Sequence, residues 1–365
     1  MDTQKRLELV REVGEEIVTE EELLSLLRTK THPIAYDGFE PSGTDIHIAQ
    51  GLLRAINISK MLKAGIRFKM LVADWHAWAN NKLGGNLERI HISGDYMLEV
   101  WKAAGMDTNR VEFVRSTDLL GRDSYWKTVM QIARNSTVKR IVRCAQIMGR
   151  KESDSLSASQ ILYPCMQAAD IFELGCDITQ LGMDQRKVNM LAREIGLKLG
   201  LWKPVVVSHH MLMGLQQVSY DDRIEHGKLS AMDRAIGMKM SKSNPDSAIF
   251  MTDSTESVRN KIKKAYCPEK IAEENPILEY CKYIVFERFN EFVIERPSKF
   301  GGNVSFQSYK ELENSYRSGK IHPTDLKNAT ADHLDRLLSP IRRKMEKSRR
   351  ATRLREEMKH FEAGK

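Results

Sequence analysis

The stretch PIAYDGFEPSGTDIHIAQGLLRAINISKMLKAGIRFKMLVAD, residues 33–74, decides the fold. It begins with a short, mostly apolar run at 33–39 that is followed by turn-forming residues. Apolar residues then recur at helical spacing, and Gly65 is suited to end a helix. The run at 68–74 is typical of a buried strand. A strand, a helix and a second strand in this order predict a βαβ unit and therefore a parallel sheet.

The pattern continues outward from this unit. Further strands are expected at 111–116, 175–182 and 204–210, with amphipathic segments between them. After about residue 250 the strand signal fades and helical patterns dominate. The segment 282–294 is compatible with helix or strand, and its neighbours favour helix. We therefore predict an α/β fold, with a Rossmann-like parallel-sheet domain followed by an α-helical domain.

Local signals refine the boundaries of these parts. Residues 6–28 read as two short helices, the second opened by a capping box of Thr19 and Glu22. Asp253 and Glu256 are placed as the N-cap and third residue of a later helix, and Pro323 suits a first helical turn. We expect an N-terminal helical segment, a parallel-sheet domain and a C-terminal helical domain at 1–30, 31–250 and 251–365.

Composition limits the classes of protein to be considered. The 365 residues carry a net charge of +8, which permits a polyanionic partner without requiring one. Five cysteines without a C-x-x-C pair fit a reducing compartment and argue against a cysteine zinc site. The highly charged N-terminus and the lack of a run of about 18 apolar residues argue against a signal peptide and a membrane span. We expect a cytoplasmic protein with no membrane partner and no resident metal site.

Neither of the two familiar phosphate-binding loops, G-x-x-x-x-G-K-[ST] or a strand-linked G-x-G-x-x-G, is present in the sequence. The segment FEPSGTDIHIAQG, residues 39–51, instead joins the first strand of the unit to its helix. Such a turn presents backbone N–H groups and the positive end of a helix dipole to phosphate. His47 lies at this point and is suited to donate to a phosphate oxygen. A helix cap or surface residue is the alternative interpretation of His47.

A second segment, GMKMSKSNPDS at 237–247, places Lys239 and Lys242 on a short loop bounded by Gly237 and the turn-forming pair 244–245. Two flexible cations on such a loop suit an anionic ligand that arrives and leaves. A solvated surface loop is the alternative. The segment with His47, at residues 39–51, favours the binding of an anionic ligand over a solvated loop.

Together the two segments resemble the H-I-G-H and KMSKS motifs of class I aminoacyl-tRNA synthetases. The chain is similar to the tyrosyl-tRNA synthetases of archaeal and eukaryotic type over roughly residues 5–345, in the segments AYDGFEPSG, LVADWHAW, ILYPCMQAADIFELGCDITQLGMDQRKVNMLARE, KIKKAYCP, NPILEYCKY, RPSKFGG and HPTDLKNA. The H-I-G-H motif here reads His47-Ile48-Ala49-Gln50. Gln50 keeps a donor but cannot carry charge. The segment 215–236 before KMSKS is longer than usual in this family, and no role is assigned to it.

The resemblance implies a binding pocket for tyrosine. Tyr36 and Asp170 would bind its phenolic hydroxyl, and Tyr163, Gln167 and Gln185 would hold the side of its α-ammonium. His76 follows a buried strand and could line the pocket; a surface histidine is the alternative. Ordinary packing is the alternative for both tyrosines, and a helix-surface carboxylate for Asp170.

The resemblance also implies sites for ATP and tRNA. The residues assigned to ATP are Gly38, His47, Ala49, Met240, Ser241 and Lys242, and those assigned to catalysis are His47, Gln50, Lys239 and Lys242. Arg186 and Lys187 match positions near the acceptor end of tRNA, whereas Phe300, His322 and Asp325 match positions near the anticodon. For Asp325 the alternative is a local role at a helix N-terminus. The basic run 342–355 is either a solvated face or a contact to the tRNA backbone.

These assignments predict a specific activity. The enzyme would activate L-tyrosine with ATP, accompanied by Mg²⁺, and pass the tyrosyl group to the 3′ end of tRNA(Tyr), acting as a homodimer. A tryptophanyl-tRNA synthetase shares the architecture, but Tyr36 with Asp170 favours a phenol. An adenylyltransferase of the H-x-G-H type would not need the helical domain. An RNA-binding paralogue without catalysis is left open by Ala49 and Gln50, although the complete KMSKS argues against it.

Overall fold

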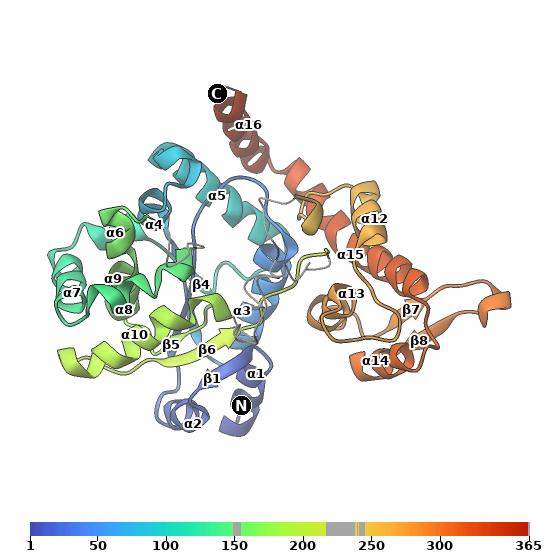
Figure 1. The fold of residues 1–365 in the computed structure, drawn as a ribbon, viewed down its shortest axis with the longest axis horizontal. Helices are drawn as coiled ribbons and strands as arrows, with labels where there is room; N and C mark the ends of the chain where they lie inside the picture. The colour runs from blue at the N-terminus through green and yellow to red at the C-terminus, as the bar shows by residue number, and fades with distance from the viewer. Residues whose placement is uncertain (149–154, 217–237, 239, 241–244, 364–365) are drawn as a thin grey trace.

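A computed structural model describes residues 1–148, 155–216, 238, 240 and 245–363. Figure 1 shows a part built around a sheet and, beside it, a part made mainly of helices that follows later in the chain. None of the helices in the described ranges is both long and apolar enough to cross a membrane. The α/β part followed by a helical part confirms the predicted fold class.

Six strands form the central sheet in the order β1-β6-β5-β2-β3-β4. All neighbouring strands are parallel except β1, which runs antiparallel to β6 at the edge. The strands are β1 (Gly14–Val18), β2 (Ile34–Phe39), β3 (Arg67–Val72), β4 (Val111–Arg115), β5 (Ile178–Thr179) and β6 (Val205–His209). The parallel pairing of β2 with β3 is the βαβ unit that residues 33–74 predict.

Helices connect and cover these strands. In the first part they are α1 (Thr3–Arg11), α2 (Glu20–Thr29), η1 (Ala49–Leu53), α3 (Arg54–Lys63), α4 (Asp74–Ala79), η2 (Lys82–Gly85), α5 (Leu87–Ala103), α6 (Ser116–Leu120), α7 (Asp123–Arg134), α8 (Val138–Val142), η3 (Ala145–Met148), α9 (Ala158–Glu173), η4 (Met183–Gln185), α10 (Arg186–Gly196) and η5 (Leu197–Leu199). The alternation of side chains along β3 explains the two layers. Phe68, Met70 and Val72 pack with residues of α3 and α5, whereas Leu71 packs with residues of α7 and α9.

The second part follows a short turn, η7 (Pro245–Ser247). It comprises α12 (Thr255–Lys264), α13 (Pro276–Tyr280), η8 (Cys281–Val285), β7 (Phe292–Ile294), η9 (Ser298–Phe300), β8 (Val304–Phe306), α14 (Tyr309–Arg317), α15 (Pro323–Lys347) and α16 (Arg349–Ala363). The last helix, α16, packs against α5 of the first part (Figure 1). The buried hydrophobic cluster therefore runs continuously from the sheet into the helical part.

Several local predictions are confirmed. Thr19 and Glu22 form both hydrogen bonds of the capping box at α2. Pro323 is the first residue of α15, and Gly65 follows α3 with a positive φ of 77°, which a glycine adopts without strain. The strands at 111–115 and 205–209 lie where the hydrophobic runs place them.

Three local predictions are wrong. The segment between the first two helices is strand β1, not helix, because the edge of β6 offers it backbone partners that sequence periodicity does not reveal. The N-cap of α12 is Ser254, since Asp253 instead accepts from Phe250 N and pairs with Lys261. The segment 282–294 is not one helix: the π-helical turn η8 covers its start, and β7 pairs with β8 at its end.

Candidate active site

The predicted tyrosine pocket is assembled from β2, α4 and α9. Tyr36 lies on β2, His76 on α4 and Asp170 on α9, and each is at most 1% exposed. The capping box of Ser157 and Gln160 opens α9, which also carries Tyr163 and Gln167 on successive turns. One helix therefore supplies three of the residues predicted to contact the substrate.

Asp170 is the centre of a buried polar group. Tyr125 Oη donates to Asp170 Oδ1 at 2.9 Å, and His76 Nε2 lies 3.0 Å from Asp170 Oδ2. Burial alone would lower the pKa of His76, but the charge of Asp170 outweighs it and raises that pKa. Burial raises the pKa of Tyr125 well above its ordinary value, and the neighbouring Asp170 adds to this rise. Asp170 is thus a buried carboxylate, not a helix-surface one.

Tyr36 carries the most informative polar atom of the pocket. Its hydroxyl is buried and has no hydrogen-bond partner among the described residues. Burial and then the charge of Asp170 raise the pKa of Tyr36 well above its ordinary value, so it is a neutral phenol at physiological pH. A buried polar group without a partner costs about 1–3 kcal/mol. An incoming hydroxyl group placed beside Tyr36 would remove that cost.

The residues predicted to hold the α-ammonium also contact one another. Gln167 Nε2 donates to Gln185 Oε1 at 3.0 Å, and Tyr163 Oη donates to Glu40 Oε1 at 2.5 Å. The ring of His76 meets that of Tyr163 edge-on at 5.0 Å, which joins this group to Asp170. The pocket residues predicted from the resemblance are therefore brought together.

Two residues of this site, Tyr125 and Glu40, were missed from the sequence. Glu40 stands in the quoted turn after β2, and its position next to a strand end was a usable signal. Tyr125 lies on α7, far along the chain from Asp170, and only the packing of α7 on α9 brings the two together. No local pattern in the sequence marks it.

The HIGH-like segment begins the helix after β2, as expected. His47 pairs with Phe250 in an isolated β-bridge, and its carbonyl accepts from Gln50 N and Gly51 N, both at 2.9 Å. His47 Nδ1 is 3.4 Å from Gln50 N, which gives it the local capping contact that was the alternative interpretation. Gln50 Oε1 is buried without a hydrogen-bond partner in the described part of the chain. The start of this helix therefore holds a second buried oxygen that a donor could satisfy.

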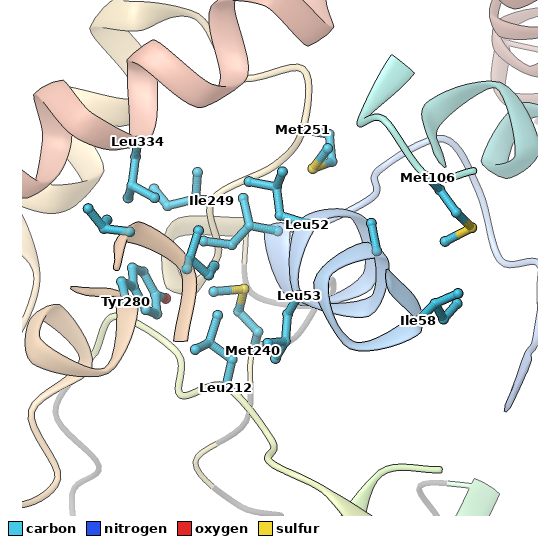
Figure 2. Packing of buried hydrophobic residues seen from close by; sticks show 14 of the residues in the cluster. Leu52, Leu53, Ile58, Met106, Leu212, Met240, Ile249, Met251, Tyr280 and Leu334 are labelled. Atoms are coloured by element: carbon cyan, nitrogen blue, oxygen red, sulfur yellow. The ribbon is translucent and has the colours of Figure 1, made fainter. Parts of the chain in front are cut away.

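The other residues assigned to ATP occupy different settings. A Cβ on Gly38 would make only ordinary contacts, the nearest 3.6 Å from Leu71 Cβ, so packing does not require glycine there. Ala49 is the first residue of η1. The side chain of Met240 is 4% exposed and packs in the core beside Leu212 (Figure 2). Lys239, Ser241 and Lys242 lie outside the described residues.

Among the residues assigned to tRNA, Arg186 and Lys187 begin α10 directly after Gln185, whereas the others lie in the helical part (Figure 1). Lys187 is in the first turn of α10, next to Arg186, which pairs with Glu16 of β1 at 2.7 Å. Phe300 is 60% exposed. His322 is the N-cap of α15, and Asp325, in its first turn, lies 4.0 Å from Arg296.

The basic run 342–355 is partly engaged within the protein. Arg342 pairs with Asp335 at 2.6 Å, and Arg350 lies 3.5 Å from Asp95 of α5. The contact of Arg350, and that of Lys344 Nζ with Ala103 O at 3.3 Å, hold the junction of α15 and α16 against the first part. Arg343 and Arg353 contact Ser339 and Glu357 of their own helices, so at least five of the eight basic residues have protein partners, and no observation decides between the two interpretations of the run.

The fold and the two signature segments together define a class I aminoacyl-tRNA synthetase. The family model of class I tRNA synthetases for tryptophan and tyrosine matches residues 28–339. The chain is 49% identical to cytoplasmic tyrosine–tRNA ligase 1 of Arabidopsis thaliana over 363 residues, which cover 99% of this chain and 89% of that protein. It therefore belongs to this family, and within it to the tyrosyl-tRNA synthetases.

Solved structures agree with this placement. The tyrosyl-tRNA synthetase of Pyrococcus horikoshii, solved with L-tyrosine, matches with a TM-score of 0.89 and 39% identity, over 98% of this chain and 100% of that one. The enzyme of Leishmania major, solved with tyrosinol, matches with a TM-score of 0.88 and 41% identity. This chain spans 99% of its own length in that match but about half, 52%, of the Leishmania chain. Enzymes of this family use ATP to activate tyrosine and then attach it to tRNA.

Proposed function

We propose that this chain activates L-tyrosine in the pocket around Tyr36 and Asp170. The observation that carries the proposal is the buried hydroxyl of Tyr36, which has no partner among the described residues and lies near the carboxylate of Asp170. A substrate phenol would donate to Asp170 and meet Tyr36 with its oxygen. Phenylalanine would leave the Tyr36 hydroxyl unpaired, at about 1–3 kcal/mol, and would lack the hydrogen bond that tyrosine donates to Asp170. The test is exchange of pyrophosphate into ATP, which should depend on tyrosine and not on phenylalanine or tryptophan.

The other end of the amino acid would be held by the second polar group. Gln167 and Gln185 offer amide oxygens, and Glu40 adds a negative charge next to Tyr163. Carbonyl and carboxylate oxygens are the acceptors that an ammonium requires. With its ammonium held by these residues, the substrate would direct its carboxylate toward the ATP.

Adenylate formation needs no protein nucleophile. The tyrosine carboxylate attacks the α-phosphate of ATP, its oxygen forms the new bond to phosphorus, and pyrophosphate leaves with the bonding electrons. The task of the protein is alignment and stabilisation of the growing negative charge. The helix start at His47 and Gln50, together with Lys239 and Lys242 of KMSKS, would supply that stabilisation. Gly38 and Ala49 would give ATP room beside the backbone, with Met240 and Ser241 in the same loop as the lysines.

Magnesium would accompany ATP instead of occupying a protein cage. The described residues include no group of three or more His, Cys, Asp or Glu side chains that could hold a metal ion. Mg²⁺ commonly takes phosphate oxygens and water with only one or two protein carboxylates. It would supply charge neutralisation on the phosphates, while the residues above orient the substrates.

We further propose that the helical part reads tRNA(Tyr). An exposed aromatic ring such as Phe300 suits stacking with an unpaired base, and Asp325 suits acceptance from a base edge. Arg186 and Lys187 would meet the acceptor end close to the tyrosine pocket. The domain boundaries proposed for this division of labour remain 31–250 for catalysis and 251–365 for the anticodon, with β1 now joining residues 1–30 to the catalytic sheet.

The assembly and location are proposed on separate observations. Trp126 and Met130 on α7 and Val138 on α8 are 42%, 60% and 67% exposed, in the middle of the catalytic part. Large apolar side chains of this kind favour a protein contact, and we propose that it is made with a second copy in a homodimer. All five cysteines are free, which supports the cytoplasm as the compartment.

A further inference from the structure

His210 joins the two parts of the molecule through three elements. Its Nδ1 is hydrogen-bonded to Glu15 Oε2 of β1 at 3.1 Å, and its Nε2 lies 3.1 Å from Glu279 Oε1 of α13. Its ring stacks on Tyr283 of η8, with centroids 4.1 Å apart and an interplanar angle of 11°. The side chain is 17% exposed. One imidazole thus lies between two carboxylates, one from each part of the molecule.

The charges around His210 favour its protonated form. Burial opposes protonation, but the contacts with Glu15 and Glu279 outweigh it and raise the pKa of His210 to about 9. The other titratable groups facing it are Lys282 and Tyr283 of η8, and His209 of β6, whose own pKa burial lowers. At neutral pH the imidazolium therefore pairs with both carboxylates.

Helix α13, which carries Glu279, also binds the backbone of the residues that follow His210. Glu279 Oε2 accepts from Met213 N at 2.9 Å, and Tyr280 Oη donates to Met213 O at 2.8 Å. Tyr280 is fully buried. The two oxygens of Glu279 thus connect His210 and the backbone of Met213, so the position of α13 is imposed on this segment.

The segment in turn anchors Met240, the residue of the KMSKS motif that the structure describes, and Met238 just before the motif. Met240 N donates to Leu212 O at 3.1 Å, and Gly214 N donates to Met238 O at 2.8 Å. The Met240 side chain packs against the same core, close to Leu212 and Leu53 (Figure 2). Met240 adjoins Lys239 in sequence and stands two residues before Lys242. A displacement at residues 212–214 would therefore move the backbone of Met238 and Met240, the described residues on either side of Lys239 in the sequence.

We propose that His210, held between Glu15 and Glu279, is a positioning residue for adenylate formation, because it transmits the position of the helical part to the backbone that anchors Met238 and Met240. The proposal rests on the proposed activation of tyrosine. It assigns His210 no contact with substrate. Its effect belongs to the step that uses the KMSKS lysines, not to the binding of tyrosine.

Single-turnover formation of tyrosyl-adenylate between pH 7 and 10, with a separate tyrosine titration, tests the proposal. We expect His210→Gln to lower the rate about tenfold at neutral pH, within the range of coupling between connected sites, and to leave the tyrosine Kd unchanged. The wild-type rate should fall with a midpoint near pH 9 as the imidazolium loses its proton, and this fall should be absent from His210→Gln. The matched control is His91→Gln, since His91 also lies 3.1 Å from a carboxylate, that of Asp74, but on α5.

A second variant keeps the proposal testable if His210→Gln disturbs folding. Glu279→Gln keeps an amide oxygen that can accept from Met213 N, but it removes one of the two negative charges beside His210. The midpoint of the alkaline fall in the adenylation rate should therefore move below pH 9. Equal losses of rate and tyrosine affinity in His210→Gln, or an unchanged alkaline fall in both variants, would overturn the proposal. If the wild-type enzyme forms no adenylate with tyrosine, the proposed function fails instead, whatever the variants do.

Discussion

At the scale of single residues, the specificity that we propose depends on how firmly Asp170 is held. Its two oxygens already have protein neighbours, Tyr125 on one side and His76 on the other. A carboxylate fixed in this way presents its remaining acceptor positions in one direction only. The pocket can therefore recognise a hydroxyl by geometry as well as by charge.

Removal of the Tyr125 hydroxyl tests this arrangement. We expect Tyr125→Phe to raise the tyrosine Kd about tenfold, since a hydrogen bond to a charged group contributes about 1.5–3 kcal/mol. The KM for ATP should change little. Tyr316→Phe is the control, because Tyr316 also donates from a tyrosine hydroxyl, to Pro268 O at 2.8 Å, but in the helical part. Equal tyrosine affinities of Tyr125→Phe and the wild type would show that Asp170 needs no support from Tyr125.

At the scale of elements, the sequence was sufficient where a local signal decides the structure. The βαβ unit, the capping box at Thr19 and the first turn at Pro323 all depend on residues close together in the chain. Strand β1 was missed because Gly14–Val18 contains two glutamates that also suit a helix, and only pairing with β6 favours the strand. Tyr125 was missed for the same reason, since its role depends on a partner 45 residues away. The pocket residues taken from the resemblance do come together, but the roles given to them stay predictions.

The helix that carries the pocket offers a prediction at this scale. Ser157 caps α9 by accepting from Gln160 N. We expect Ser157→Ala to lower the free energy of unfolding by about 1 kcal/mol, measured by urea denaturation. The tyrosine Kd should stay within about twofold, because packing on α7 and α10 keeps the helix in place. Ser155→Ala, an exposed serine before the helix, is the control, and an equal loss in both variants would contradict the capping role.

At the scale of the whole molecule, the sites that we propose for tyrosine activation and for tRNA reading lie in different parts of the fold. The proposed tyrosine pocket lies in the part with the central sheet, while Phe300, His322 and Asp325 lie in the helical part. A continuous core and the α5–α16 contact join the two parts. Substitutions in one part should therefore separate the two reactions.

Asp325 provides that separation. We expect Asp325→Ala to leave tyrosine-dependent exchange unchanged and to reduce tRNA charging, with a loss that depends on the anticodon base. The measurement is charging of tRNA with natural and altered anticodons. Asp332→Ala is the control on the same helix, because Asp332 pairs with Arg259 instead. A loss that is identical for all anticodons would mean that Asp325 only stabilises the N-terminus of its helix, which contributes about 0.3–1 kcal/mol to the free energy of unfolding.

The most direct test of the central claim is amino-acid-dependent exchange of labelled pyrophosphate into ATP. It should be run with tyrosine, phenylalanine, tryptophan and no amino acid, for the wild type and for Tyr36→Phe. The wild type should exchange with tyrosine at least about thirtyfold faster than with phenylalanine, since the lost hydrogen bond to Asp170 and the unpaired Tyr36 hydroxyl together cost about 2 kcal/mol or more. Tyr36→Phe should lower the ratio of the exchange rate with tyrosine to that with phenylalanine. Exchange with tryptophan or phenylalanine as fast as with tyrosine would contradict the assignment of Tyr36 and Asp170 to a phenol.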